Sequence, residues 1–198
     1  MRIIAGKYGR RKLETPKNNH IRPTSDKIRG SIFNALQSHI DLNGVRVLDL
    51  FSGTGALGLE ALSRGAKFCQ FFDNDRESFL LTRFNADTLA TSWDFKTTMA
   101  DATKLPECKD EKKFDLFFCD PPYEKDLISP CLKTLHDQNW LNDGAIGVLE
   151  TEKDAKIEYG ANFEVLSEKN YGDTDIIFIR YIFIFDSQSL GGIKFLTM

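Results

Sequence analysis

The feature that most constrains the fold is an alternation of short apolar runs with helical patterns, which starts at residue 45. Short apolar runs are typical of buried strands, and the segments between them repeat apolar residues at helical spacing. We expect strands at Val45–Leu50, Phe68–Phe72, Phe95–Ala100, Phe114–Cys119 and Ala145–Glu150, and helices at Ala56–Arg64, Arg76–Leu89 and Asp126–His136. This alternation predicts an α/β fold with a mostly parallel sheet and helices on both faces.

Both ends of the chain depart from this pattern. A short hairpin is predicted for residues 1–13 and a loop for residues 14–20. A helix then opens at Pro23, with Thr24 or Ser25 as its cap, and extends to about Ile40. Near the other end, Phe163–Leu166 and Ile176–Phe185 predict an antiparallel hairpin that completes a seven-stranded sheet. We therefore expect an N-terminal extension (1–40), a main domain (41–185) and a tail (186–198).

A glycine-rich turn, residues 49–58, follows the first predicted strand and opens a helix. Its G-x-G-x-x-G spacing lets the backbone turn sharply and approach a ligand closely, as in sites for NAD, FAD and S-adenosylmethionine. Asp49 precedes the turn, where a carboxylate suits the cationic amino group of a methionine moiety and would repel a pyrophosphate. The turn therefore favours S-adenosylmethionine. Its candidate binding residues are Asp49, Phe51, Ser52, Gly53 and Gly55.

Acidic residues also follow the second and third strands. We expect Asp73, with Asn74 beside it, to accept the ribose hydroxyls of the cofactor, and Asp75 to cap the helix from Arg76. Asp101, next to Ala102, fits two roles equally well: an acceptor for the adenine amino group, or a helix N-cap.

The fourth strand ends in Asp120-Pro121-Pro122-Tyr123. Two prolines end the strand and fix the backbone at the edge of the sheet where ligands bind. An exocyclic amine on a base is a weak nucleophile, and two acceptors, Asp120 and the carbonyl of Pro121, can aim its lone pair at a methyl group. Tyr123 offers a face for stacking of the base. The segment, with Pro122, is our candidate for the catalytic site.

Charge is unevenly distributed along the chain. Residues 1–30 hold nine Lys or Arg and two acids, a net +7, although the whole chain carries −3. Such an arm fits contact with nucleic-acid phosphates or a solvated surface. The candidate RNA-binding residues are Arg10, Arg11, Lys12, Arg22, Thr24, Arg29 and Tyr123. Arg22 and Arg29, seven residues apart, could equally contact phosphate, face the methionine carboxylate or form a surface salt bridge.

The sequence gives no indication of a metal site, a membrane helix or a signal peptide. The four cysteines and three histidines are scattered without metal-ligand spacing, so we expect reduced cysteines and no metal. No apolar run reaches the roughly 18 residues of a membrane helix, and the polar start is unlike a signal peptide. We expect a cytoplasmic protein without a membrane partner.

Taken together, these motifs resemble the amine-methylating branch of the Rossmann-like, class I methyltransferases. More closely, the chain is similar to the bacterial small-subunit ribosomal RNA guanine-N2 methyltransferase family of the RsmD type. The likeness lies in residues 1–6, 22–29, 31–34, 49–66, 120–123 and 171–174. Two features depart from the family: Gly30 stands where a glutamate is usual, and residues 186–198 extend beyond the usual end.

The resemblance implies methylation, by S-adenosylmethionine, of the N2 amine of one guanine in 16S rRNA. It also implies an assembled or assembling small ribosomal subunit as the substrate, and we expect a monomer. A DNA adenine-N6 or cytosine-N4 methyltransferase would use the same motif, but usually carries a larger target-recognition region. Glutamine methylation, an NAD-dependent oxidoreductase and a non-catalytic RNA-binding module explain the motifs less completely.

Overall fold

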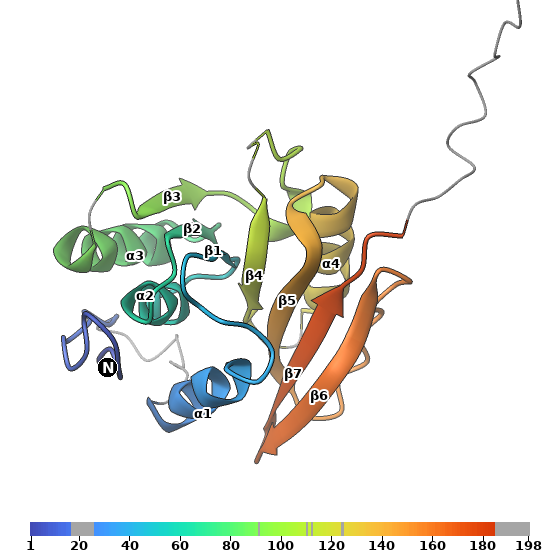
Figure 1. Cartoon of the computed structure of the whole chain (residues 1–198), viewed down its shortest axis with the longest axis horizontal. Helices are drawn as coiled ribbons and strands as arrows, with labels where there is room; N and C mark the ends of the chain where they lie inside the picture. The colour runs from blue at the N-terminus through green and yellow to red at the C-terminus, as the bar shows by residue number, and fades with distance from the viewer. Residues whose placement is uncertain (17–25, 91, 110, 112, 124, 185–198) are drawn as a thin grey trace, which may run out of the picture.

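The computed structural model describes residues 1–16, 26–90, 92–109, 111, 113–123 and 125–184. Strands in this part of the chain form one sheet of seven, in the order β3-β2-β1-β4-β5-β7-β6 (Figure 1). The strands are β1 (Arg46–Asp49), β2 (Phe68–Asp73), β3 (Phe95–Met99), β4 (Phe114–Cys119), β5 (Leu141–Glu152), β6 (Phe163–Tyr171) and β7 (Thr174–Tyr181). The helices are α1 (Asp26–Leu36), α2 (Ala56–Ser63), α3 (Arg76–Leu89), α4 (Ile128–Asp137) and the short 3-10 helix η1 (Ala102–Lys104).

Strand directions confirm the predicted topology. β1 to β5 run parallel, and β7 pairs antiparallel with both β5 and β6. The chain builds outward from β1 to β3 and then crosses back to place β4 on the other side of β1. In sheets with such a reversal, ligands usually bind at the carboxyl ends of the two strands beside it, here β1 and β4.

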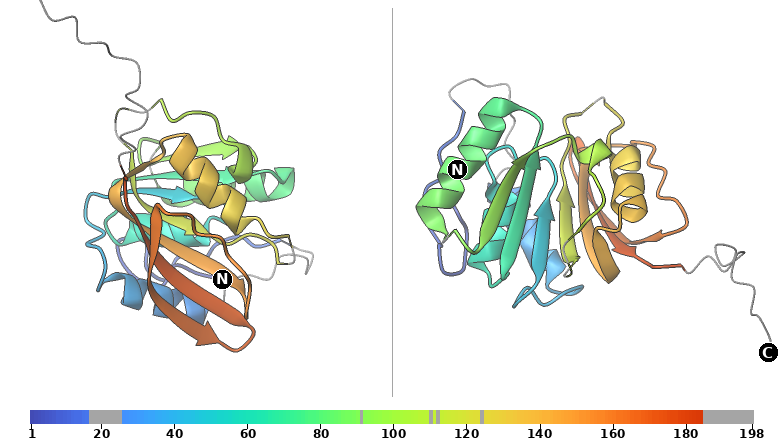
Figure 2. Two further views of the ribbon diagram at one scale, coloured as in Figure 1. Left: turned by 90° about the vertical axis from the view of Figure 1, so that its right-hand side faces the viewer. Right: turned by 90° about the horizontal axis from the view of Figure 1, so that it is seen from above.

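Helices cover both faces of the sheet (Figure 2). α1, α2 and α3 share a core with one set of strand side chains, and α4 and η1 share a core with the other set. Because successive strand residues point to opposite faces, Leu116 and Phe118 of β4 belong to the first core and Phe117 and Cys119 to the second. Burial on both faces explains why β4 is an uninterrupted apolar run.

Several element boundaries differ from prediction. β5 starts at Leu141 instead of Ala145, since Leu141 pairs with Phe114 across an irregularity in the register. β7 ends at Tyr181, four residues before the predicted Phe185. α1 ends at Leu36, where the Ser38 hydroxyl donates to the carbonyl of Ala35. α4 starts at Ile128 rather than Asp126, because Asp126 has a left-handed backbone (φ 46°) that a helix excludes.

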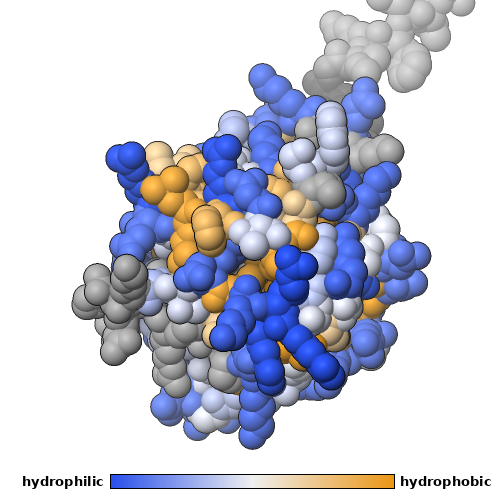
Figure 3. Space-filling model, turned by 90° about the vertical axis from the view of Figure 1, so that its left-hand side faces the viewer, coloured by the Kyte–Doolittle hydropathy of each residue, from blue (hydrophilic) through white to orange (hydrophobic). Residues whose placement is uncertain are grey.

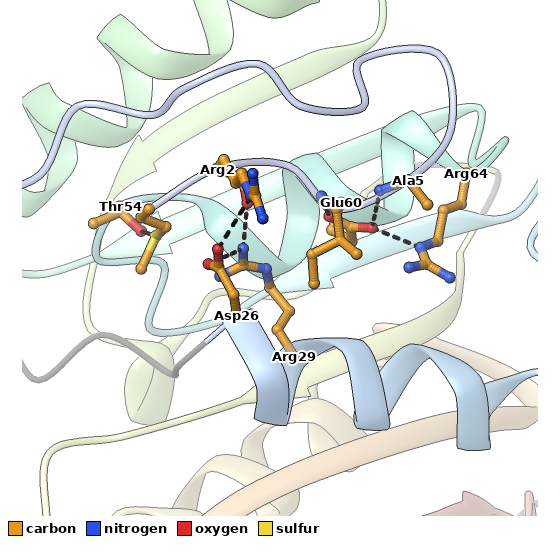
Figure 4. A network of polar contacts seen from close by, with 9 residues as sticks. Arg2, Ala5, Asp26, Arg29, Thr54, Glu60 and Arg64 are labelled. Carbon is orange, nitrogen blue, oxygen red and sulfur yellow. Dashed lines mark hydrogen bonds and ion pairs between the residues drawn. The ribbon is translucent and has the colours of Figure 1, made fainter.

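The N-terminal hairpin is a single antiparallel bridge between Arg2 and Lys12, bound to α2. The carboxylate of Glu60, fully buried on α2, accepts from the backbone N–H groups of Ile4 (2.7 Å) and Ala5 (3.1 Å) and from Arg64 (2.7 Å; Figure 4). Hairpin and α1 also contribute to the first hydrophobic core. The described part of residues 1–40 is thereby fixed to the body of the molecule.

Candidate active site

The predicted cofactor and catalytic residues lie at one edge of the sheet. The ends of β1 and β4 are in register, with Asp49 opposite Phe118, and the N–H of Leu50 donates to the carbonyl of Phe118 (3.1 Å). The ends of β2 and β3 align in the same way, with Asp73 opposite Met99. Strand register therefore brings together segments far apart in the sequence: residues 49–55, 73–75, 101–102 and 120–123.

The glycine-rich turn has the geometry that its spacing predicts. Gly53 (φ 55°) and Gly55 (φ 77°) both adopt the left-handed backbone, and Gly55 is the N-cap of α2. Gly58 has a different role, because a Cβ there would lie 2.4 Å from Cε1 of Phe71 and 2.6 Å from Sγ of Cys69. The first two glycines shape the turn, and the third lets α2 lie against β2.

Asp49 lies at the end of β1 as predicted, but it is only 2% exposed. Its Oδ2 accepts from the backbone N–H of Gly58 (2.9 Å), which ties the strand to α2. Burial raises the pKa of this carboxyl to about 7, opposed by the Gly58 hydrogen bond and assisted by the charge of Asp73. Asp49 thus has a structural role, and its contact with a ligand amino group remains a prediction.

Asp73 and Asp75, at the end of β2, make different hydrogen bonds. Asp73 accepts from the backbone N–H groups of Gly53 (2.8 Å) and Asp75 (2.9 Å), and burial raises its pKa. Asp75 caps α3 by accepting from the N–H of Ser78 (2.9 Å), which confirms the predicted cap. Asn74 between them is exposed. A ribose contact by Asp73 remains a prediction, and its carboxylate also fixes the turn.

Asp101 acts as an N-cap, one of its two expected roles. It precedes η1 and accepts from the N–H (2.9 Å) and the hydroxyl (2.7 Å) of Thr103, and the hydroxyl bond lowers its pKa most. Ala102 is buried against the second core, and its carbonyl faces the thiol of Cys131. Both residues lie at the sheet edge where an adenine contact was predicted.

The Asp-Pro-Pro-Tyr segment leaves β4 directly after Cys119. Pro121 is buried and Pro122 exposed, while Asp120 and Tyr123 are partly exposed. The hydroxyl of Tyr123 lies 2.8 Å from that of Thr174, the first residue of β7. The closing hairpin therefore holds the tyrosine, a role for residues 171–174 that sequence reasoning missed.

Two buried polar residues of α3, Thr82 and Asn85, were also missed. Thr82 pairs with the Ser52 hydroxyl (3.1 Å) and donates to the carbonyl of Gly53 (2.9 Å). Asn85 donates to the carbonyl of Thr54 (2.9 Å). One turn of α3 thus satisfies the carbonyls of the glycine turn. Polar residues on the buried face of a predicted amphipathic helix were the available signal.

A recess open to solvent adjoins the Asp-Pro-Pro-Tyr segment. Pro121, Pro122 and Tyr123 form one side, and the end of β5 with the residues after it forms another. Glu150, Thr151 and Glu152 of β5 line it together with Lys125, Asp126, Leu127, Ile128, Ser129, Ala155, Lys156 and Ile157. The sequence pattern gave no indication of this recess, because it depends on which strand neighbours β4.

The candidate RNA-binding residues of the N-terminal extension fall into three groups. Arg10, Arg11 and Lys12 are exposed on the hairpin, and Figure 3 views this side of the molecule, where hydrophilic side chains gather beside exposed apolar ones. Arg22 and Thr24 lie outside the described residues. Arg29 is fully buried: its guanidinium pairs with Asp26 (3.0 Å) and donates to the carbonyl of Arg2 (Figure 4). The structure therefore corrects the assignment of Arg29, which holds the hairpin against α1 and is too buried to bind RNA phosphate.

Two other kinds of site have no counterpart within the described ranges. No group of three or more His, Cys, Asp or Glu residues there is arranged to hold a metal ion. No helix in that part of the chain is long and apolar enough to span a membrane. The four cysteines are free thiols, three of them buried, which agrees with their structural interpretation.

Solved structures share this fold. A candidate methyltransferase of Escherichia coli, yhhF, superposes with a TM-score of 0.79 at 28% identity, covering 92% of this chain and 98% of that one. A candidate methylase of Haemophilus influenzae gives a TM-score of 0.76 at 29% identity with the same coverage. The sheet order, the glycine turn and these structural relatives define a Rossmann-like methyltransferase fold.

Sequence comparison identifies the family. The model of the family described as "Conserved hypothetical protein 95" matches residues 1–180. The ribosomal RNA small subunit methyltransferase D of Haemophilus influenzae is 35% identical over 176 residues, 87% of this chain and 89% of that protein. The chain belongs to this family, the RsmD-type methyltransferases.

Proposed function

We propose that this protein transfers a methyl group from S-adenosylmethionine to the N2 amine of one guanine in 16S rRNA. The observation that carries the proposal is the position of Asp120-Pro121-Pro122-Tyr123 at the end of β4, beside the glycine turn after β1. Acceptors for an amine and a turn suited to a cofactor thus follow the ends of two neighbouring parallel strands. The names of the curated relatives, which refer to small-subunit rRNA, support the substrate class.

The residues present fit S-adenosylmethionine. A Cβ added to Gly53 would meet no atom within 4 Å, so the turn faces open space that a ligand can enter. Acidic side chains follow β1, β2 and β3 at this edge, a charge pattern that suits a cation and opposes a pyrophosphate. Asp49 would face the amino group, Asp73 the ribose hydroxyls, and Asp101 with Ala102 the adenine. Phe51, Ser52, Gly55 and Asn74 would complete the contacts.

When bound, S-adenosylmethionine would supply a methyl group on a cationic sulfur for transfer to the N2 amine, with S-adenosylhomocysteine as the other product. Asp120 and the carbonyl of Pro121 accept the two N–H groups of the amine and so direct its lone pair toward the methyl group. The amine loses one proton, and Asp120 is positioned to receive it. Tyr123, held by Thr174, stacks on the base.

The exposed basic residues of the hairpin give this substrate its electrostatic attraction. Arg10, Arg11 and Lys12 would contact rRNA phosphates; in support, all three are exposed, and the hairpin that carries them is hydrogen-bonded to α2. The described part of residues 41–184 includes no large insertion for reading a base sequence, which suits a target presented by a ribosomal particle. We further propose that the enzyme acts as a monomer in the cytoplasm.

Calorimetry tests the cofactor. Titration of the purified protein is expected to show binding of S-adenosylmethionine and S-adenosylhomocysteine, and no binding of NAD. Binding of NAD alone would refute the proposed class of reaction and favour an oxidoreductase.

Mapping of rRNA modifications tests the substrate. Mass spectrometry of 16S rRNA from a strain lacking the gene is expected to show the loss of one N2-methylguanine, restored by the wild-type gene. If every N2-methylguanine persists in the deletion strain, the rRNA assignment is wrong. Loss of N6-methyladenine or N4-methylcytosine from DNA would support the alternative reaction on DNA.

A further inference from the structure

We infer that the outer side of α3 and the tip of the N-terminal hairpin together bind an unpaired stretch of the substrate RNA, away from the target base. We call this surface, made of Leu80, Phe84, Trp93 and residues 7–12, the α3 surface. Its aromatic rings stack on bases, and its basic side chains contact phosphates. The inference rests on the proposed function in one respect, the identification of RNA as the substrate.

Large apolar side chains are exposed on α3 and just beyond its end. Leu80 and Phe84, one helical turn apart on the same side of α3, are each more than half exposed. Trp93, between α3 and β3, is 88% exposed, whereas Trp140, the other tryptophan of the chain, is only 6% exposed. Several large apolar side chains exposed close together are typical of a surface that binds a partner.

The basic hairpin lies beside this part of α3. The backbone N–H of Glu14 donates to Oδ1 of Asn85 (2.9 Å), and Nδ2 of Asn85 donates to the carbonyl of Glu14 (3.1 Å). At the tip of the hairpin, Nζ of Lys7 lies 3.8 Å from the carboxylate of Asp94, the residue after Trp93. The two contacts hold the hairpin against both α3 and the loop that follows it. Figure 3 shows hydrophilic and apolar side chains gathered on this side of the molecule.

The chemistry of the α3 surface favours single-stranded RNA as its occupant. Residues 7–12 include no acid and four exposed cations: Lys7, Arg10, Arg11 and Lys12. Cations attract phosphates, and exposed aromatic rings stack on bases that are not already stacked in a duplex. A second copy of this chain fits less well, because two-fold pairing of the surface with itself would bring the cations of both copies together.

The α3 surface extends away from the Asp-Pro-Pro-Tyr segment. α3 begins after Asp75 at the carboxyl end of β2, and Trp93 precedes β3, so Trp93 lies at the opposite edge of the sheet. α3 has 14 residues, and at about 1.5 Å per residue it is about 21 Å long. The surface therefore contacts nucleotides other than the target guanine, and it contributes affinity for the substrate without taking part in the chemistry.

The fluorescence of Trp93 reports its stacking. Because Trp140 is buried, a soluble quencher such as acrylamide acts mainly on Trp93. Saturation with oligouridine is expected to protect Trp93 from quenching, whereas an RNA duplex of the same length should protect it much less. Absence of protection by oligouridine would overturn the proposal, and equal protection by the duplex would exclude unpaired RNA as the occupant.

Variants measure the contribution of each ring. Trp93→Ala and Phe84→Ala should each raise the KM for small subunits about tenfold, the effect of losing one base stack, and leave kcat unchanged. Trp93→Phe should restore most of the loss, since phenylalanine also stacks. Val165→Ala, which truncates an exposed apolar residue of β6, is the matched control and should leave KM unchanged. Calorimetry should show unchanged affinity for S-adenosylmethionine in all four variants.

Salt dependence separates the stacking from the phosphate contacts. Arg11→Gln should lower the slope of log affinity for oligouridine against log salt by about 0.7, the value for one phosphate contact on a single strand. Trp93→Ala should weaken binding and leave the slope unchanged. A slope that Arg11→Gln does not alter would contradict the role of the hairpin tip.

Other outcomes identify a different occupant or a failure elsewhere. If Trp93→Ala and Phe84→Ala bind oligouridine like wild type but bind small subunits more weakly, the surface binds a ribosomal protein and the proposal is wrong. A wild-type dimer that Trp93→Ala converts to a monomer in sedimentation would make the surface an interface between copies, and would also overturn it. If wild type binds oligouridine through Trp93 but transfers no methyl group to small subunits, the proposed function fails and the RNA-binding surface stands.

Discussion

The glycine turn and the Asp-Pro-Pro-Tyr segment meet at one edge of the sheet, but different means hold them in place. The turn is fixed by hydrogen bonds from distant elements: Asp73, Thr82 and Asn85 bind its backbone, and Asp49 binds Gly58. In the Asp-Pro-Pro-Tyr segment, two prolines restrict the backbone, and the hydroxyl of Tyr123 contacts that of Thr174. The difference suggests that damage to the turn should cost folding and cofactor binding, whereas damage to the segment should cost turnover.

The largest expected effect separates the two regions. Asp120→Ala should reduce methyl transfer by on the order of a thousandfold. The change removes both a hydrogen-bond acceptor for the amine and the group that takes up its proton. The affinity for S-adenosylmethionine should change less than threefold. Single-turnover kinetics and calorimetry measure the two quantities, and an equal loss in both would contradict the division of roles.

Asp49→Asn tests the buried carboxylate at the turn. Its folded pKa of about 7 exceeds the ordinary 3.8, so its contribution to stability is fully present below pH 3.8 and is lost as the pH rises through 7. Without cofactor, the unfolding free energy of the variant relative to wild type should therefore increase between pH 4 and pH 8, by up to about 4 kcal/mol. Urea unfolding measures it, with Asp41→Asn on the surface as control. A difference that does not vary with pH would contradict the burial argument.

Gly58→Ala tests the packing of α2 on β2. The added Cβ overlaps with the ring of Phe71 and the sulfur of Cys69, so a loss of about 1–3 kcal/mol in stability is expected. Gly30→Ala in α1 is the matched control, because its nearest neighbour would be Cδ1 of Ile4 at 3.7 Å. The control should gain up to about 1 kcal/mol from helix propensity. Thermal unfolding of both variants measures these changes, and equal shifts in Tm would contradict the packing role of Gly58.

The smallest expected effect concerns the contact between Tyr123 and Thr174. Tyr123→Phe and Thr174→Val should each reduce turnover by up to about tenfold, the value of one hydrogen bond. The double variant should lose no more turnover than the more impaired of the two single variants, since both changes remove the same contact. If the two losses multiply, the threonine does not act through the tyrosine.

The sequence predicted what depends on local pattern, and the structure supplied what depends on strand order. The glycine turn, the cap at Asp75 and the end of β4 follow from residues adjacent in the chain. The contact of Thr174 with Tyr123 could not be predicted, because β7 reaches this segment only after the sheet has assembled.

Arg29 is a case in which the sequence favoured a contact that the fold excludes. Charge and helical spacing favoured a contact with RNA, whereas the fold buries the guanidinium between the hairpin and α1. A pattern in one segment does not reveal the segment that will cover it.

The position of the transferred methyl group distinguishes methylation of guanine N2 from methylation of another amine. Small subunits from the deletion strain are incubated with wild-type protein and S-adenosylmethionine labelled with carbon-13 in the methyl group, and their RNA is digested and analysed by mass spectrometry. The label is expected on N2 of a single guanine. Label on adenine N6 or cytosine N4, or no transfer by protein that binds the cofactor, would contradict it.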